Sequence, residues 1–190
     1  MLSQGGGALM ADAGSSGSTR WVALLRGVNV GGITVRSAPL AAMFRDLGYA
    51  DVRTVLASGN VVFSAAGAAA TLKTEIERAL SETFGYEAWI VLLPQSDLDA
   101  IIAGYPFGER DGHHPYVVFG SDSSVLAEAA RFAESLGDAD ERVAPGSGVL
   151  YWEAPAGSST STAFAKELAK KRYKATTTTR NLRTLRKLLP

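Results

Sequence analysis

The chain has 190 residues, of which 46% are hydrophobic and 20% charged, which is typical of a globular protein with one domain or two small ones. Basic and acidic residues number 19 each, so overall charge gives no reason to seek nucleic acid or a membrane. The absence of cysteine excludes disulfides, thiolate catalysis and cysteine-based metal sites. The lack of cysteine fits a reducing cytoplasm, where we expect the protein, and no run approaches the roughly 18 apolar residues of a membrane-spanning helix.

The charge is unevenly distributed along the chain. Residues 166–190 contain nine Lys or Arg and one acidic residue, whereas the preceding part carries an acidic excess. The basic segment can meet an anionic partner or the acidic remainder of the same chain, and we favour the second. Residues 1–19 are rich in Gly, Ser and Ala and lack the basic start and apolar centre of a signal peptide. We expect them to form a disordered extension.

Hydrophobic periodicity over residues 20–95 predicts the order strand, helix, strand, strand, helix, strand. Ser37 is the expected N-cap of the first helix, and the apolar residues of the second recur at three- and four-residue spacing. Ser58-Gly59-Asn60 is the expected hairpin turn, because glycine and asparagine tolerate positive φ. The predicted ranges are 21–27, 37–47, 52–57, 61–64, 71–84 and 87–93.

The same order recurs over residues 115–190, after a connector at residues 96–114 that contains a short helix at 96–103. The expected strands are 116–119, 141–145, 149–153 and 173–177, and the expected helices are 125–136, 161–171 and 181–189. Two βαββαβ units in tandem form an α+β fold in which helices cover antiparallel sheets. We therefore predict two tandem ferredoxin-like units.

The segments Leu25-Arg26-Gly27-Val28-Asn29-Val30-Gly31-Gly32, 52–63 and Thr179-Arg180-Asn181 resemble those of the bacterial domain of unknown function 1697 family. The resemblance extends from Trp21 to Pro190; it implies the doubled ferredoxin-like fold and no established activity. One segment departs from the family. Relatives carry a glycine-arginine-serine-lysine-leucine type of sequence where this chain reads Gly157-Ser158-Ser159-Thr160-Ser161-Thr162-Ala163-Phe164. If that segment holds an anion in relatives, the site is lost or altered here.

The loop from Arg26 to Gly32 is the first candidate binding site. It combines a permanent positive charge, the amide of Asn29 and glycines whose backbone N–H groups are unobstructed, which suits a phosphate or carboxylate. It matches neither the Gly-x-Gly-x-x-Gly pattern nor a P-loop. Alternatively, the glycines only shape a turn and Arg26 pairs with a buried acid. Ser58 and Asn60 lie in a second polar turn, and the sequence leaves open whether both turns share one end of the sheet.

Arg180 lies just before the last predicted helix. The hydroxyls of residues 176–179 can cap that helix, and its dipole favours an anion. The alternative, which we favour, is ordinary capping with Arg180 on the surface. We expect Arg183, Arg186 and Lys187 to form the solvated face of the helix.

His113 and His114 are neighbours in an expected loop, with Glu109 and Asp111 as the nearest acids along the chain. No histidine or carboxylate spacing typical of a metal site is present, so we expect no metal and no cofactor. Six aromatic residues are interpreted as core or sheet packing. They are Trp89, Tyr105, Phe107, Tyr116, Tyr151 and Trp152. Adjacent strand residues face opposite ways, so either Tyr151 or Trp152 can serve a ligand.

These observations support three hypotheses of function. The first is binding of a small anionic or polar ligand in a cleft, with contacts from Arg26, Asn29, Ser58, Asn60 and Arg180. The second is a cofactor-independent cyclase, isomerase or lyase of a specialised biosynthetic pathway, in which an arginine polarises a carbonyl and a tyrosine or histidine moves a proton. The third is nucleic-acid binding through residues 166–187, which neutral overall charge and the missing RNA-binding motif disfavour. The sequence does not specify an oligomeric state.

Overall fold

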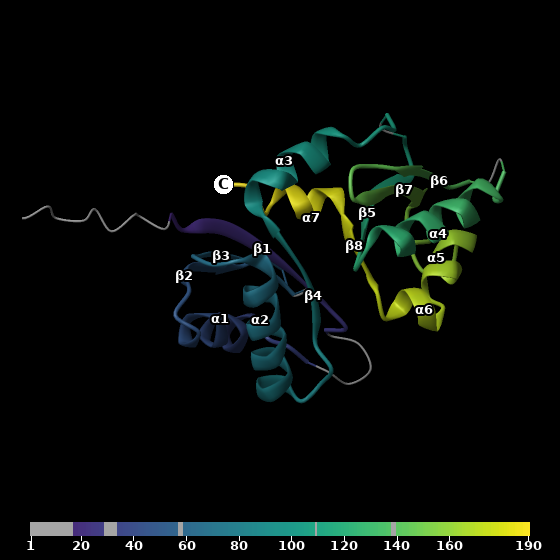
Figure 1. Ribbon diagram of the computed structural model, residues 1–190. Coiled ribbons are helices and arrows are strands. Elements are labelled where there is room, and N and C mark those ends of the chain that lie inside the picture. Colours follow the sequence, from purple (N-terminus) through teal and green to yellow (C-terminus); the bar gives the residue numbers. More distant parts are fainter. Residues whose placement is uncertain (1–16, 29–33, 57–58, 109, 138–139) are drawn as a thin grey trace, which may run out of the picture.

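The computed structural model describes residues 17–28, 34–56, 59–108, 110–137 and 140–190 (Figure 1). Asn29 and Ser58 of the candidate site, Glu109 and most of the expected N-terminal extension lie outside these ranges. The described chain is α+β, with two four-stranded antiparallel sheets and helices packed against them. Within the described residues, no helix is long and apolar enough to cross a membrane.

The first sheet is covered on one face by two helices. Its strand order is β2-β3-β1-β4, formed by β1 (Thr19–Arg26), β2 (Ala50–Thr54), β3 (Asn60–Ala65) and β4 (Trp89–Pro94). The covering helices are α1 (Ser37–Asp46) and α2 (Ala69–Phe84) (Figure 1). Alternate residues of β1, including Ala23 and Leu25, pack with Phe44 and Ile76 beneath these helices.

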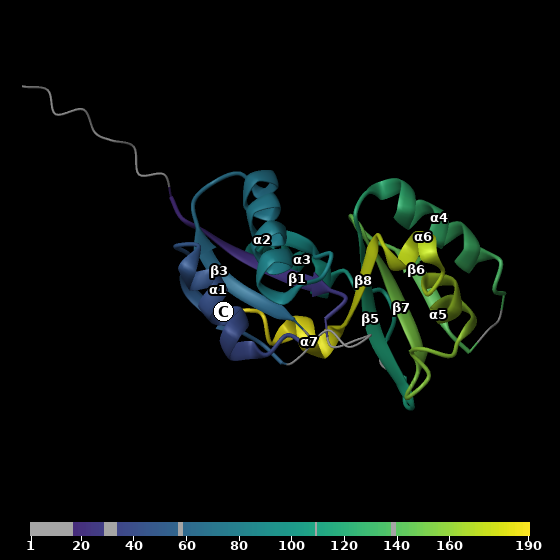
Figure 2. The ribbon, with the colours of Figure 1, turned by 90° about the horizontal axis from the view of Figure 1, so that it is seen from below.

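The second sheet repeats this plan. Its order is β6-β7-β5-β8, formed by β5 (His113–Gly120), β6 (Arg142–Pro145), β7 (Val149–Pro155) and β8 (Thr177–Asn181). One face is covered by α4 (Ser123–Glu134), α5 (Ala163–Leu168) and α6 (Lys171–Lys174) (Figure 2). Val118, Trp152, Phe164 and Tyr173 form the core under these helices.

A third core joins the two halves. Two further helices, α3 (Gln95–Ala103) and α7 (Leu182–Arg186), lie between the sheets (Figures 1 and 2). Val22 and Leu24 point away from α1 and α2 and are fully buried, in one cluster with Val117, Tyr151 and Leu185. Each sheet therefore has apolar residues on both faces, and any site at the boundary draws on both halves.

Several boundaries differ from the prediction. Residues 171–174 form a helical turn, and the strand expected at 173–177 runs from Thr177 to Asn181. Tyr173 decides this, because its side chain is 1% exposed in the core and its carbonyl accepts from the Thr177 hydroxyl. The residue before α1 is Arg36, which makes no side-chain cap, so Ser37 is the first helical residue and not the expected N-cap.

Candidate functional site

The C-terminal end of β1 and the turn before β3 lie at the same end of the first sheet. Because β1 and β3 are antiparallel, Leu24 stands opposite Asn60, and the Leu25 N–H donates to the Gly59 carbonyl oxygen at 2.8 Å. Gly59 has a φ of +69°, and a Cβ there would lie 2.7 Å from Val28 Cγ2. The two candidate loops are thus in contact, which the sequence had left open.

The preferred prediction placed Arg180 on the surface, and this is wrong. Arg180 is buried between the halves, with 8% of the residue exposed. Its side chain donates to Asn60 Oδ1 at 2.6 Å, to the Leu25 carbonyl oxygen at 2.6 Å and to Thr178 Oγ1 at 2.8 Å. Burial lowers the pKa of Arg180 to about 10, which leaves the guanidinium protonated at neutral pH. Asn60 donates in turn to the Val55 carbonyl oxygen at 2.9 Å. We call these contacts the Arg180 bridge, since they join β8 to the first sheet.

Arg26 lines a cavity of about 390 Å³ at the boundary of the two halves, which we call the Arg26 cavity. Burial lowers the pKa of this guanidinium, and the charge of Glu87 opposes that shift. The alternative prediction paired Arg26 with a buried acid, but Glu87 is exposed, and within the described ranges Arg26 forms no ion pair. The polar lining of the cavity includes Arg26, Tyr116, Ser159, Thr160, Lys174 and Thr179.

Strand alternation separates Arg26 from Arg180. Thr177, Thr179 and Asn181 share one face of β8 and line the Arg26 cavity, whereas Arg180 points from the opposite face toward Asn60. The predicted residues therefore divide into two groups. Arg26 belongs to a cavity, and Asn60 and Arg180 belong to the bridge.

The sequence did not identify Lys174 as a site residue, and it flagged Ser159 and Thr160 only through the departure from the family's basic segment. The start of α5 next to this segment is already satisfied by the chain itself. Thr162 Oγ1 accepts from the Ala165 N–H at 3.1 Å, and Glu141 accepts from the Phe164 N–H at 3.0 Å. A ligand in the cavity would thus contact side chains and not the helix terminus.

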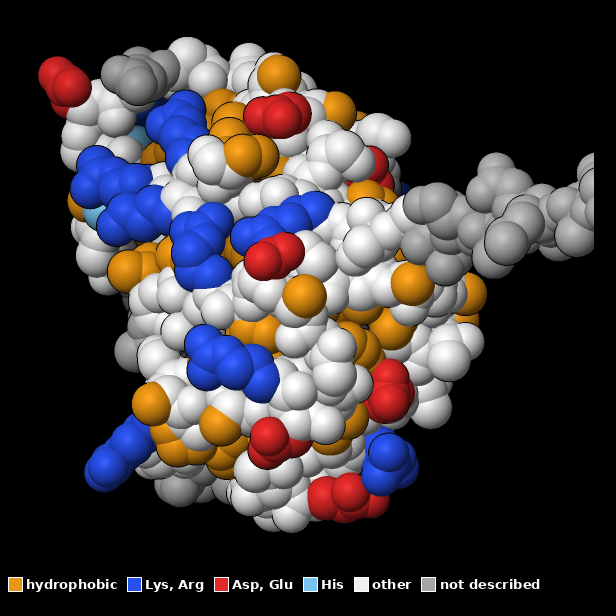
Figure 3. Space-filling model, turned by 90° about the vertical axis from the view of Figure 1, so that its left-hand side faces the viewer, with side chains coloured by type: hydrophobic (Ala, Val, Ile, Leu, Met, Phe, Trp, Pro, Cys, Tyr) orange, Lys and Arg blue, Asp and Glu red, His pale blue; other side chains and the backbone are white. Residues whose placement is uncertain are grey.

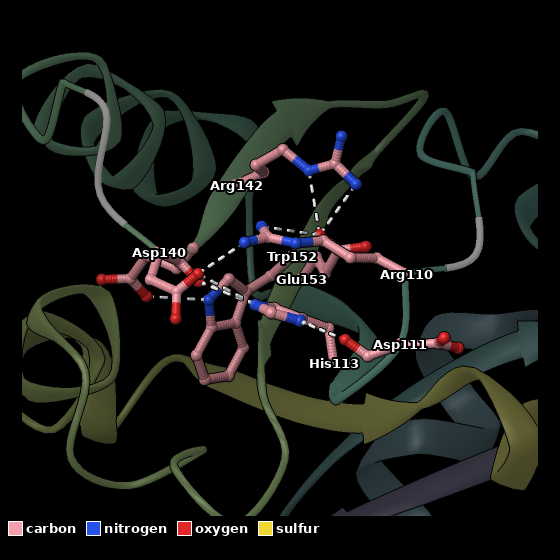
Figure 4. Close-up of polar contacts among 8 residues, drawn as sticks. Arg110, Asp111, His113, Asp140, Arg142, Trp152 and Glu153 are labelled. Carbon is pink, nitrogen blue, oxygen red and sulfur yellow. Dashed lines mark hydrogen bonds and ion pairs between the residues drawn. The ribbon is translucent and has the colours of Figure 1, made fainter.

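A polar network outside this cavity holds His113 in place (Figure 4). His113 begins β5 and does not lie in the expected loop. Its Nε2 lies 3.1 Å from Asp140 Oδ1 and its Nδ1 3.0 Å from the Asp111 carbonyl oxygen. The hydrogen bond to Asp111 is the main cause that raises the pKa of His113, and the hydrogen bond from His113 is the main cause that lowers the pKa of Asp140.

The same network neutralises the buried carboxylate of Glu153. Arg142 Nε donates to Glu153 Oε1 at 2.9 Å, and Arg110 lies 3.7 Å from that oxygen while donating to Asp140 at 2.6 Å (Figure 4). Some partners in this network lie far apart in the sequence: His113 and Asp140 are separated by 27 residues. The local sequence therefore did not reveal the network. Within the described ranges, no group of three His, Asp or Glu side chains is arranged to hold a metal ion.

The fold and the cavity define an α+β protein of two antiparallel sheets that share a core and have an open, cationic, hydroxyl-lined pocket at their boundary. Residues 18–151 match the family described as "Protein of unknown function (DUF1697)", and the chain belongs to this family, as the resemblance predicted. No curated protein matches the sequence.

Among solved structures, the chain is similar to conserved bacterial protein SP0830 from Streptococcus pneumoniae. The TM-score is 0.76 at 27% sequence identity, and the alignment covers 90% of this chain and 97% of that protein. A protein from Galdieria sulphuraria aligns at 11% identity, over 87% of this chain and 98% of that protein, with a TM-score of 0.28, too low to support an inference.

Proposed function

We propose that the protein binds a small anionic or polar ligand in the Arg26 cavity. The observation that carries this proposal is that Arg26 and Lys174, which come from different halves of the chain, line one cavity with the hydroxyls of Ser159, Thr160 and Thr179. Its volume of about 390 Å³ lies within the range of small-molecule pockets. A guanidinium and an ammonium beside hydroxyl groups form charge-assisted hydrogen bonds to carboxylate or phosphate oxygens.

The composition of the lining favours binding over turnover. Among its described residues are two cations, hydroxyls, the Asn181 amide and Tyr116, but no carboxylate and no imidazole. Imidazole and carboxylate are the commonest general acids and bases, and the lining offers only Tyr116 and Lys174 for proton transfer. For this reason the cofactor-independent enzyme ranks second for this cavity.

The proposal includes the finer description of the fold as two tandem ferredoxin-like units, residues 20–95 and 115–190, joined by a connector at 96–114. Two observations support it. In each sheet the first and third strands of the unit are central, and the helices that follow the first and third strands cover one face. This arrangement leaves the opposite face of each sheet free to form the shared core.

Isothermal titration of the full chain against a panel of small carboxylates and organic phosphates tests the proposal. We expect at least one compound of the panel to bind with an affinity that Arg26→Ala and Lys174→Ala each weaken about tenfold, the size of one lost charge-assisted hydrogen bond. Arg20→Ala is the matched control, because Arg20 lies at the other end of β1 and pairs with Asp51 at 3.5 Å. If Arg26→Ala leaves the affinity of every binding compound unchanged, Arg26 is not part of a ligand site.

A further inference from the structure

A second cavity of about 640 Å³ lies on a different side of the boundary between the halves. Its walls come from Leu56 of the first half, from Ile102, Tyr105 and Phe107 before β5, and from α7. We call it the α7 cleft. It meets the Arg26 cavity only at Asn181, which lines both and caps α7 through Oδ1. The proposed ligand site does not account for it.

The α7 cleft is lined by a cluster of cations. Arg183, Arg186 and Lys187 follow the helical spacing of three and four residues, so they project from one side of the helix, and all three are exposed. In the described part of the chain, none of the three forms an ion pair. Figure 3 shows a row of Lys and Arg side chains on one face, with histidine next to its end, and the two histidines of the chain both line this cleft.

The acidic residues of the cleft do not cancel this charge. Glu153 is 3% exposed at its side chain and is already neutralised by Arg142 at 2.8 Å, with Arg110 at 3.7 Å. Asp111 is the other carboxylate of the described lining. Four Lys and Arg side chains line the cleft with two carboxylates. Arg142 pairs with Glu153 and Asp140 pairs with Arg110 from outside the cleft, which leaves Arg183, Arg186 and Lys187 beside Asp111. An anion with more than one negative charge fits this balance.

Part of the cleft lining is apolar, and it includes a residue with a strained backbone. Leu56 is 48% exposed and is the one large hydrophobic side chain exposed to that degree in the described chain. Its φ of +59° lies in the left-handed region, which non-glycine residues rarely occupy and which is often associated with binding sites. Together with Ile102, which also lines the cleft, Leu56 offers an apolar contact to a ligand.

We propose that the α7 cleft binds a small organic phosphate whose apolar portion contacts Leu56. The phosphate dianion lies against Arg183, Arg186 and Lys187, and the apolar portion lies against Leu56 and Ile102. A cleft of about 640 Å³ lies within the size range of small-molecule pockets, which favours a metabolite-sized ligand.

Phenyl phosphate, inorganic phosphate and a short single-stranded RNA are the probes, titrated calorimetrically into the full chain at low salt. We expect Arg183→Ala/Arg186→Ala to weaken binding of phenyl phosphate and of inorganic phosphate about tenfold or more. Leu56→Gly, which also relieves the positive φ, should weaken phenyl phosphate about threefold and leave inorganic phosphate unchanged. Melting curves check that each variant is folded.

The control Arg45→Ala/Arg131→Ala removes the same charge from exposed positions on α1 and α4 outside the cleft. Its phenyl phosphate affinity should stay within twofold of the unmodified chain. An equal loss in this control would overturn the proposal, since general electrostatic attraction would then explain binding. Tight RNA binding without phenyl phosphate binding would overturn it in favour of a nucleic-acid surface. Arg26→Ala should not change phenyl phosphate affinity, so this cleft and the Arg26 cavity succeed or fail separately.

Discussion

The charged guanidinium of Arg180 is buried, with little access to solvent. The cation is accommodated because its donors meet oxygens fixed by the first sheet, the Leu25 carbonyl and the Asn60 amide, each at 2.6 Å. Removing one partner of such a buried set costs more than the net value of the hydrogen bonds, because the remaining polar groups lose their solvation as well. Asn60 and Arg180 are therefore residues of stability in this structure, and Arg26 is a residue of the cavity.

We expect Arg180→Ala to lower the free energy of unfolding by about 2–5 kcal/mol, because the buried Leu25 carbonyl oxygen and Asn60 Oδ1 each lose the hydrogen bond from Arg180. Arg180→Lys should recover only part of this loss, since one ammonium lacks the planar fork that reaches both oxygens. Arg183→Ala is the control; its exposed side chain should contribute within about 0.5 kcal/mol. Urea denaturation of the three variants measures these differences. Equal stability of Arg180→Ala and Arg183→Ala would rule out the bridge.

At the scale of elements, the β2–β3 hairpin requires glycine at position 59 for two reasons. The backbone there has a positive φ, and a side chain there would clash with the core. Gly59 and Gly85 have nearly the same φ, +69° and +68°. A Cβ at Gly59 would lie 2.9 Å from the Cβ of buried Leu25, whereas a Cβ at Gly85 meets nothing within 4 Å. Both alanine variants suffer the left-handed strain, and only one adds a clash with the core.

Gly59→Ala should therefore destabilise the protein by about 1–3 kcal/mol more than Gly85→Ala, the usual cost of overpacking. The pair is a matched comparison, since the strain of positive φ cancels in the difference. Chemical denaturation of both variants under one condition measures it. If the two variants lose the same stability, Val28 and Leu25 move aside without cost and the hairpin is more adaptable than its contacts indicate.

Local pattern predicted α2 well and the end of the second half poorly. Leu72, Ile76, Ala79 and Leu80 of α2 are buried on one face, as their spacing indicated. The threonines at 176–179 favour a strand equally, so propensity alone could not show where the strand begins and ends. Long-range contacts place it, because Tyr173 packs under α4 and α5 while Tyr116 pairs with Asn181.

At the scale of the whole molecule, the two halves are fastened by their shared core and by the C-terminal segment. Leu182, Leu185 and Leu188 enter that core, and Arg53 of β2 donates to the carbonyl oxygens of Lys187 at 3.0 Å and Leu189 at 3.2 Å. Both proposed ligand sites lie along this join, which explains why the sequence revealed only one wall of each. Arg26 stood out in its glycine-rich loop, whereas Lys174 lies far along the chain, where it is one of several cations in the basic segment and has no feature that distinguishes it.

Because the core is shared, a defect in it should weaken both halves together. Leu185 is fully buried between the sheets, so Leu185→Ala should cost about 2–5 kcal/mol by leaving a cavity. We expect one cooperative transition in urea for the variant and the unmodified chain. Hydrogen exchange should show that amides of β1 and of β7 lose protection by the same free energy. Ala129→Gly, in the core under α4, alters the second half alone. If the two halves unfold together, this variant should also lower the hydrogen-exchange protection of β1. If either variant loses amide protection only in β5–β8, the halves unfold separately and the shared core contributes little to stability. The ligand sites at the boundary would then open before either sheet unfolds.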